Sequence, residues 1–246
     1  MFIPSKLHHS SSLSTNCFIP EYFGIVCWNV HKNNDENSFY KTYLETVAKQ
    51  YHFLFLQEAN FRDDTPFMLS DFMFDAAANL EFRGMFYGVL SASKIVSKSA
   101  QAYLSEGKET LIGPHKSLLV TKYIFEDGSP LIVLNVHAIN FRKHQVYTKE
   151  LERFLELMYP YKGAMIVTGD FNTWNKKRMY TLHRLREKLK LKMVPFDQKD
   201  AVKSFMGNQL DFIFYRGVEL LEYHVDKRQT FSDHNPLFAQ FKKASV

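Results

Sequence analysis

The chain has 246 residues, of which 46% are apolar and 23% are charged. This is the composition of a folded globular protein, which excludes general disorder, and the chain is long enough to bury a core without disulfides. No apolar run approaches the roughly 18 residues of a membrane span, and no secretory signal is visible, so we expect no integral membrane association. The two cysteines, Cys17 and Cys27, exclude a disulfide scaffold and favour a cytoplasmic protein with reduced thiols.

Residues 1–20 are polar and aperiodic, and we expect them to form a loosely ordered lead-in to a single domain over 21–246. Hydrophobic periodicity predicts helices over 34–50, 64–79 and 143–158. Short apolar runs predict strands over 21–30, 52–57, 85–93, 115–125, 131–137, 164–168, 192–196, 211–215, 218–225 and 237–241. The polar stretch 94–114 between two of these strands is expected to be a loop with an edge strand. Because strands and helices alternate along the chain, the sequence predicts a layered α/β architecture.

The net charge of +5 is concentrated in one segment. Residues 175–192 contain eight basic residues and one acidic residue, so the remainder of the chain is slightly acidic. The same segment places Met179, Leu182, Leu185 and Leu189 on one helical face. One interpretation is an amphipathic helix with a solvated basic face, and the other is a surface that faces phosphate groups.

Several predicted strands end in polar groups that could act together. Functional groups gather at one end of the strands in layered α/β folds, because the loops there converge on one surface. The groups are Asn29, Glu58, His137, Asp170, Asn172, Asp211, Asp233 and His234. Carboxylates and amides are hard oxygen ligands for Mg²⁺, and histidines can stabilise charge on a phosphoryl group. This set therefore indicates phosphate-ester hydrolysis. The motifs of zinc proteases, P-loop NTPases and α/β-hydrolases are absent from the sequence.

The order of these motifs resembles that of the endonuclease/exonuclease/phosphatase superfamily, which includes exonuclease III-like and pancreatic-type DNases. The resemblance spans residues 28 to 236 and consists of WN, QE, NVH, GDFN, LD and SDHNP in the order typical of the family. Finer features, such as GVLSAS and GDFNTW, are similar to a bacterial YafD-like branch. The resemblance implies a four-layer α/β sandwich, in which two mixed β-sheets pack face to face and are flanked by helices.

The resemblance also implies a role for each site residue. Glu58 and Asn29 would bind Mg²⁺, or Mn²⁺ in its place, with Asp233 as a second carboxylate on the metal side. Asp170 would activate water, and Asn172 would orient Asp170. Asp211 would keep His234 oriented and cationic, and His137 would donate to the developing charge. We further expect substrate contacts from residues around the NVH and GDFN motifs, namely Asn140, Arg142, Trp174, Lys176, Lys177 and Arg178.

Three functions follow from this set of residues. The first is a Mg²⁺-dependent phosphodiesterase acting on nucleic acid as a monomer, favoured by the basic segment directly after GDFNTW. The second is a phosphatase or phospholipase acting on a phosphoinositide, a sphingolipid or a small phosphoester, because the same catalytic residues serve it. The third, an inactive scaffold, is disfavoured because no member of the catalytic set is missing.

Overall fold

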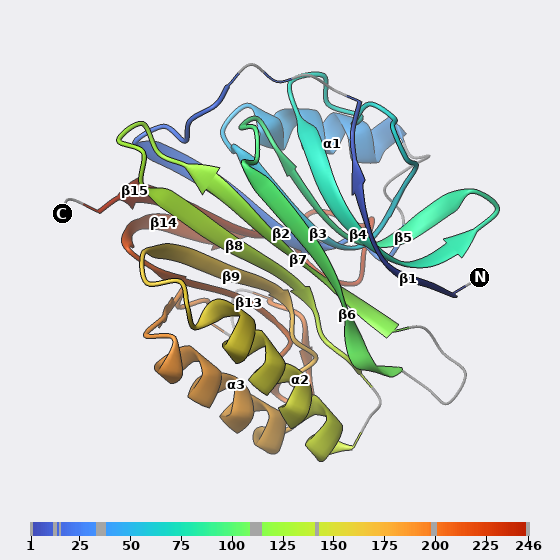
Figure 1. Cartoon of the computed structure of the whole chain (residues 1–246), viewed down its shortest axis with the longest axis vertical. Helices are drawn as coiled ribbons and strands as arrows, with labels where there is room; N and C mark the ends of the chain where they lie inside the picture. The colour runs from blue at the N-terminus through green and yellow to red at the C-terminus, as the bar shows by residue number, and fades with distance from the viewer. Residues whose placement is uncertain are drawn as a thin grey trace.

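The structure is a computed structural model that describes residues 2–11, 14, 16–32, 38–108, 115–140, 143–197 and 201–244. Its strands form two large mixed sheets and one small hairpin. Figure 1 shows the two large sheets lying against each other, with helix α1 on one side and helices α2 and α3 on the other. This is the four-layer sandwich that the resemblance implied, so the predicted fold class is confirmed.

The first sheet has seven strands in the order β1-β4-β5-β3-β2-β15-β14. Only β2 and β3 run parallel, and the other neighbours are antiparallel. The bounds are β1 Phe2–His9, β2 Tyr22–Asn29, β3 Phe53–Phe61, β4 Met73–Phe82, β5 Met85–Ser93, β14 Val218–Val225 and β15 Leu237–Lys243. Helix α1 (Ser38–Ala48) packs on the outer face of this sheet through residues such as Tyr40 and Leu44.

The second sheet has six strands in the order β10-β13-β9-β8-β7-β6, of which only β8 and β9 are parallel. The bounds are β6 Ser99–Lys108, β7 His115–Ile124, β8 Pro130–His137, β9 Ala164–Asp170, β10 Lys192–Met193 and β13 Asp211–Arg216. Helices α2 (His144–Met158) and α3 (Lys176–Lys188) cover its outer face and contribute Phe154, Leu182 and Leu185 to a buried cluster. The edge strand expected within 94–114 is β6, while residues 109–114 lie outside the described chain.

The main core lies between the two sheets. It contains Ile25 and Phe53 from the first sheet and Val133, Ile166 and Ile213 from the second, all with zero exposure. Strands that are buried on both faces read as continuous apolar runs, which is why 52–57 and 131–137 were recognisable from the sequence. Burial of these apolar side chains is the principal source of stability of such a sandwich.

The prediction of a helix over 64–79 is wrong. Strand β4 occupies Met73–Phe82 and pairs with both β1 and β5. Three consecutive alanines, Ala76 to Ala78, favour a helix when taken alone, but all three are buried in the middle of the sheet. The backbone of Ala77 also packs so closely against Gly88 that a Cβ there would lie 1.9 Å from the Ala77 oxygen. Tertiary packing thus overrides the local preference.

The N-terminal segment is more ordered than the lead-in that we expected. Residues Phe2–His9 form β1 at the edge of the first sheet, with Leu7 opposite Ala77 and His8 opposite Ala76. The ring of His8 is buried against Phe61 and Phe86, and its Nδ1 lies 2.9 Å from Asp63 Oδ1. None of the helices in the described ranges is long and apolar enough to span a membrane.

Candidate active site

The polar residues that the sequence predicted at strand ends meet at one end of the sandwich. Asn29 ends β2, His137 ends β8, Asp170 ends β9 and Asp211 begins the antiparallel β13. In this arrangement Asp170 lies opposite both His137 and Asp211 in the second sheet. A cavity of about 490 Å³ opens over this end and is lined by Asn29, His31, Glu58, Lys116, His137, Asn140, Asp170, Asn172, Trp174, Lys203, Phe205, Leu210, Asp233 and His234.

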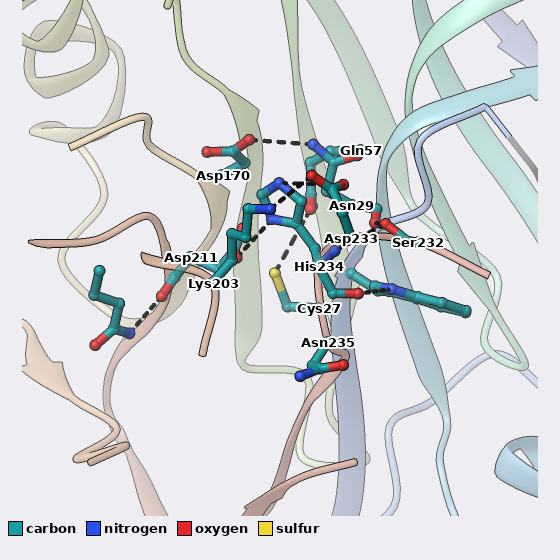
Figure 2. Close-up of polar contacts among 12 residues, drawn as sticks. Cys27, Asn29, Gln57, Asp170, Lys203, Asp211, Ser232, Asp233, His234 and Asn235 are labelled. Atoms are coloured by element: carbon teal, nitrogen blue, oxygen red, sulfur yellow. Dashed lines mark hydrogen bonds and ion pairs between the residues drawn. The ribbon is translucent and has the colours of Figure 1, made fainter. Parts of the chain in front are cut away.

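Asp170 is the most tightly held carboxylate of the site. It is buried, and Asn29 Nδ2 donates to its Oδ2 (3.1 Å), as Figure 2 shows. The backbone N–H of Asn172 donates to its Oδ1 (2.9 Å). Asn172 adopts a left-handed backbone with φ of 50°, which lets the chain turn back onto Asp170, and its side-chain amide donates to Ala138 O (2.9 Å). Burial, reinforced by the neighbouring Asp211, raises the pKa of Asp170 to about 6.

His234 and Asp211 form a buried pair. His234 Nδ1 donates to Asp211 Oδ2 (2.8 Å), so Nε2 is the ring nitrogen that remains for a ligand (Figure 2). Burial by itself lowers the pKa of His234, but the carboxylates of Asp211, Asp170 and Asp233 outweigh this effect and raise it to about 9. A raised pKa favours the cationic form of the imidazole at neutral pH.

The loop that carries His234 is anchored to β2. Trp28 Nε1 and Gln229 Nε2 each donate to the His234 carbonyl at 2.8 Å. Ser232 Oγ donates to Asn29 O (2.6 Å) and accepts from the N–H of His234 (3.1 Å). These bonds couple the C-terminal SDH motif to the first strand of the site across 200 residues of sequence.

Glu58 reaches the cavity through a distortion of β3. The strand has a bulge between Leu56 and Ala59, and Glu58 itself has a positive φ of 51°. A bulge re-aims a side chain, and this one leaves Gln57 buried while the Glu58 carboxylate lines the cavity. His137 Nε2 lies 3.7 Å from both Glu58 Oε1 and Asp170 Oδ2. Burial, and then the positive charges of Lys116, His234 and Lys32, hold the pKa of His137 well below its ordinary value.

The residues present are suited to a divalent metal ion. One oxygen of Asp211, Oδ1, is buried without a hydrogen-bond partner among the described residues. Ligand atoms of Asp170, Asp211 and His234 lie within 4.8 Å of one another. Unpaired buried carboxylate oxygens are costly unless a cation or donor satisfies them, and oxygen-rich sites suit Mg²⁺ or Mn²⁺. This group differs from the predicted metal set Asn29, Glu58 and Asp233, in which Asp233 is exposed and pairs with Lys203 Nζ (2.7 Å).

The predicted substrate-binding residues separate into four groups. Asn140 and Trp174 line the cavity, and Lys176 and Lys177 are exposed at the start of α3 but outside the cavity wall. Arg142 lies outside the described residues. The prediction that Arg178 contacts the substrate is corrected by the structure, because its side chain has zero exposure. Its guanidinium donates to the carbonyls of Ile139 (2.8 Å), Asn140 (2.8 Å) and Asn172 (3.0 Å) instead of facing solvent.

Arg178 therefore joins two loops of the site from behind. The guanidinium lies over the rings of Tyr147 (4.3 Å) and Trp174 (4.8 Å). Tyr147 Oη donates to Phe171 O (3.0 Å), and the backbone N–H of Ile139 donates to the buried Glu150 Oε2 (3.3 Å). We infer that this network positions the loops after β8 and β9. The helical periodicity of 175–192 placed Arg178 close to the apolar face, but sequence reasoning assigned it to the substrate.

Sequence reasoning missed two lysines, a histidine and two apolar side chains of the cavity wall. His31, Lys116 and Lys203 line the cavity with the catalytic set. Phe205 and Leu210, which lie just before and just after the short strand β12 (Asn208–Gln209) and its preceding turn, also line the cavity together with Trp174. No motif marks these positions. Only the proximity of residues 203–210 to the LD motif could have suggested them.

A mixed-sheet sandwich with carboxylates, amides and an imidazolium at one end is the architecture of a phosphoesterase. The model of the Endonuclease/Exonuclease/phosphatase family matches residues 26–234, and the chain belongs to this family. Members of the family are hydrolytic phosphoesterases. The family that the motifs predicted is thereby confirmed.

Relatives in sequence are bacterial proteins designated UPF0294, in agreement with the YafD-like branch. The Vibrio campbellii protein is 31% identical over 220 residues, which covers 88% of this chain and 76% of the relative. The Erwinia tasmaniensis protein is 30% identical over 252 residues, which covers 98% of this chain and 90% of the relative.

Solved structures share the fold at low sequence identity. The endonuclease/exonuclease/phosphatase from Beutenbergia cavernae has a TM-score of 0.65 at 13% identity, covering 91% of this chain and 72% of that one. ANGEL2, described as a 2′,3′-cyclic phosphatase, has a TM-score of 0.64 at 13% identity, covering 97% and 98%. TDP2 from D. rerio, complexed with a single-strand DNA product, has a TM-score of 0.57 at 14% identity, covering 91% and 100%.

Proposed function

We propose that this chain is a Mg²⁺-dependent phosphodiesterase that hydrolyses nucleic acid by in-line attack of water. The observation that carries the proposal is the buried Asp170 carboxylate, held by two donors beside the His234–Asp211 pair. A base for water and a cation for the phosphoryl oxygens thus lie at one end of one cavity. The Lys116 and Lys203 side chains in the cavity wall, together with the imidazole of His234, favour an anionic substrate.

Each side chain has a role in this proposal. Asp170 accepts the proton of the attacking water, while Asn29 and Asn172 fix the orientation of its carboxylate. Asp211 holds His234 so that Nε2 donates to a phosphoryl oxygen, and His137 donates to the charge that develops there. Glu58, Asp170 and Asp211 would hold the metal with Asn29 beside them and Asp233 at the cavity rim, and a bound Mg²⁺ would neutralise phosphate charge as a Lewis acid.

Nucleic acid is proposed as the substrate on two grounds. The cavity combines positive groups with the rings of Trp174 and Phe205, and aromatic rings can stack on bases. A structure with the same fold, TDP2, holds a single-strand DNA product. The basic face of α3 is a weaker ground for this substrate, because Arg184 and Lys188 line the groove between α2 and α3 and not the cavity.

The test compares wild type with Asp170→Asn on single-stranded DNA, single-stranded RNA, plasmid DNA, phosphoinositides and sphingomyelin, in Mg²⁺ and in EDTA. We expect Mg²⁺-dependent cleavage of nucleic acid, and a loss of about 10²–10³-fold in kcat for Asp170→Asn, as is typical when one preorganised group is removed. Asp127→Asn, which changes a carboxylate in an exposed turn, is the matched control and should retain full activity. Hydrolysis of the lipids alone would replace this proposal by the lipid phosphoesterase, and activity that persists in EDTA would refute the metal requirement.

A further inference from the structure

A short hairpin stands at the mouth of the cavity. Strands β11 (Ser204–Phe205) and β12 pair directly, and the two residues between them, Met206 and Gly207, both have positive φ (49° and 76°). Two positive φ values in a two-residue loop are typical of a type I′ turn, which is the tightest hairpin connection. The hairpin is therefore a compact element that presents its side chains in fixed positions.

The base of the hairpin is fastened to the active site. Lys203 Nζ donates to Asp233 Oδ2 (2.7 Å), and Lys203 O accepts from the N–H of Leu210 (2.9 Å). Asn208 Nδ2 donates to the carbonyl of Trp174 (3.2 Å). Since Asp211 follows directly in β13, the hairpin is joined by hydrogen bonds or by the chain itself to Trp174, Asp233 and Asp211.

The hairpin exposes apolar side chains beside a polar site. Phe205 is 56% exposed and Met206 is 80% exposed, although both could have been polar without loss to the core. The aromatic contacts within the described part of the chain leave Phe205 without a stacked ring. Phe205 lines the same cavity as Trp174, whose ring is supported by the Arg178 guanidinium (4.8 Å). Phe205 and Trp174 thus place two aromatic rings in one cavity beside the polar groups of the site.

We propose that Phe205 and Trp174 form a subsite for an unpaired nucleobase of the substrate, next to the groups that bind the scissile phosphate. This inference rests on the proposed function and narrows it to single-stranded or frayed nucleic acid. A base inside a duplex is already stacked on its neighbours, whereas an unpaired base offers a free face to an aromatic ring. A lipid headgroup has no such flat ring, and a two-residue tip offers little apolar area for docking to a membrane.

The experiment measures binding rather than turnover. Labelled pentathymidylate and an abasic strand of the same length are titrated by fluorescence anisotropy against the Asp170→Asn protein in Mg²⁺, so that the strands stay intact. We expect the base-containing strand to bind about 10- to 100-fold more tightly, because stacking on an aromatic side chain contributes that much per base. Adding Phe205→Ala should reduce this preference towards unity without changing the affinity for the abasic strand, and Phe205→Tyr should retain it.

The control is Phe82→Ala, which removes a ring that is equally exposed (56%) at the end of β4, outside the cavity. It should leave the preference unchanged. Equal binding of the two strands by the parent, no binding of either, or a preference that survives Phe205→Ala would overturn the subsite. The subsite would also be overturned if the parent bound phosphatidylcholine vesicles and showed no preference for bases, and Phe205→Ala abolished the vesicle binding.

Hydrolysis of bis(p-nitrophenyl) phosphate by wild type tests the proposed function independently of the base subsite. That substrate carries no base, so its Mg²⁺-dependent turnover tests the phosphoesterase and leaves the base subsite to the binding measurement. Turnover of this substrate by wild type, together with a failed binding test of the Asp170→Asn protein, would refute the subsite alone. A passed binding test, together with a wild type that hydrolyses no phosphodiester, would refute the proposed reaction.

Discussion

At the scale of single residues, Arg178 shows why a basic residue beside a catalytic motif need not touch the substrate. Removing its charge from water costs free energy. Hydrogen bonds to three main-chain carbonyls and contacts with two aromatic rings offset this cost. Two of the carbonyls belong to the loop after β8, and the third belongs to Asn172 after Asp170. The residue thus ties together the two loops on which Asn140 and Asn172 lie.

We predict that Arg178→Met lowers the free energy of unfolding by about 3 kcal/mol, because it leaves buried carbonyls without their donors. It should also lower kcat more than it raises KM, since the loops that hold Asp170 lose their support. Urea denaturation and steady-state kinetics measure the two effects. Arg184→Met, on the exposed side of the same helix, is the control and should change stability by less than about 0.5 kcal/mol. Equal effects of the two substitutions would contradict a positioning role.

At the scale of elements, the sequence drew attention to helix α3 as a phosphate-facing surface, whereas the structure places the β11–β12 hairpin at the cavity. The helix has the highest density of positive charge, yet Arg184 and Lys188 lie along the outer groove between α2 and α3. The hairpin carries no recognisable motif, yet its first neighbour, Lys203, lies in the cavity wall. On the proposed function, we therefore expect Lys203 to contact a substrate phosphate more directly than Arg184 or Lys188 does.

We predict that the double substitution Arg184→Gln with Lys188→Gln leaves the salt dependence of nucleic-acid binding unchanged. Lys203→Gln should weaken binding and reduce the slope of log K against log salt by about one, the change expected for one lost phosphate contact. Titrations at several salt concentrations measure both slopes. A larger reduction of this slope in the double variant than in Lys203→Gln would instead indicate that α3 binds the substrate.

Element prediction succeeded where burial follows from local pattern. The strands that end at Asn29, His137 and Asp170 are continuous apolar runs, and α2 has a regular apolar face, so both are visible without a structure. It failed at β4, where the alanine run lies between two neighbouring strands that the local sequence does not reveal. It also missed β1, because its partner is β4, some 70 residues away.

At the level of the whole molecule, we expect the buried carboxyl group of Glu150 to make stability depend on pH. Burial raises the pKa of Glu150 from an ordinary value of 4.5 to about 8, against the hydrogen bond from Ile139 and the charge of Arg178. The folded state therefore keeps a proton up to about pH 8, while the unfolded chain releases it near pH 4.5. Because the unfolded state binds fewer protons in this window, stability falls as pH rises through it.

We predict that Glu150→Gln removes this dependence, because glutamine is neutral and its oxygen can still accept from Ile139. The two proteins should have similar free energies of unfolding near pH 5. As pH approaches 8, the free energy of unfolding of wild type should decrease relative to that of the variant by at most about 1.4 kcal/mol per pH unit. Thermal or urea unfolding between pH 5 and 8 measures the difference. Glu156→Gln, exposed on the same helix, should keep the wild-type profile. Parallel profiles for wild type and Glu150→Gln would disprove the assignment.

The site itself exists only in the assembled sandwich. Asn29 and Glu58 come from the first sheet, whereas His137, Asp170 and Asp211 come from the second. The Gln57 side-chain amide joins the two sheets just below the site by donating to Asn135 Oδ1 (2.7 Å), and Asn135 in turn donates to Leu90 O (3.0 Å). At Gly169, an added Cβ would lie 2.0 Å from Val136 O, so the approach of β9 to β8 behind Asp170 requires glycine.

The polar groups that meet at the cavity, their order along the chain and the layered class of fold could all be predicted from the sequence. This was possible for Asn29, Glu58, His137 and Asp170 because each lies at or next to the end of an apolar run that is buried on both faces, a pattern visible in the local composition. Tertiary structure alone decided which side chains face the cavity: Arg178 turns inward to bind carbonyls, Lys203 and Phe205 enter the cavity wall, and Asp233 pairs at the rim. The physical reason is that side-chain direction and burial at these positions depend on contacts between segments far apart in the chain, which no local pattern records.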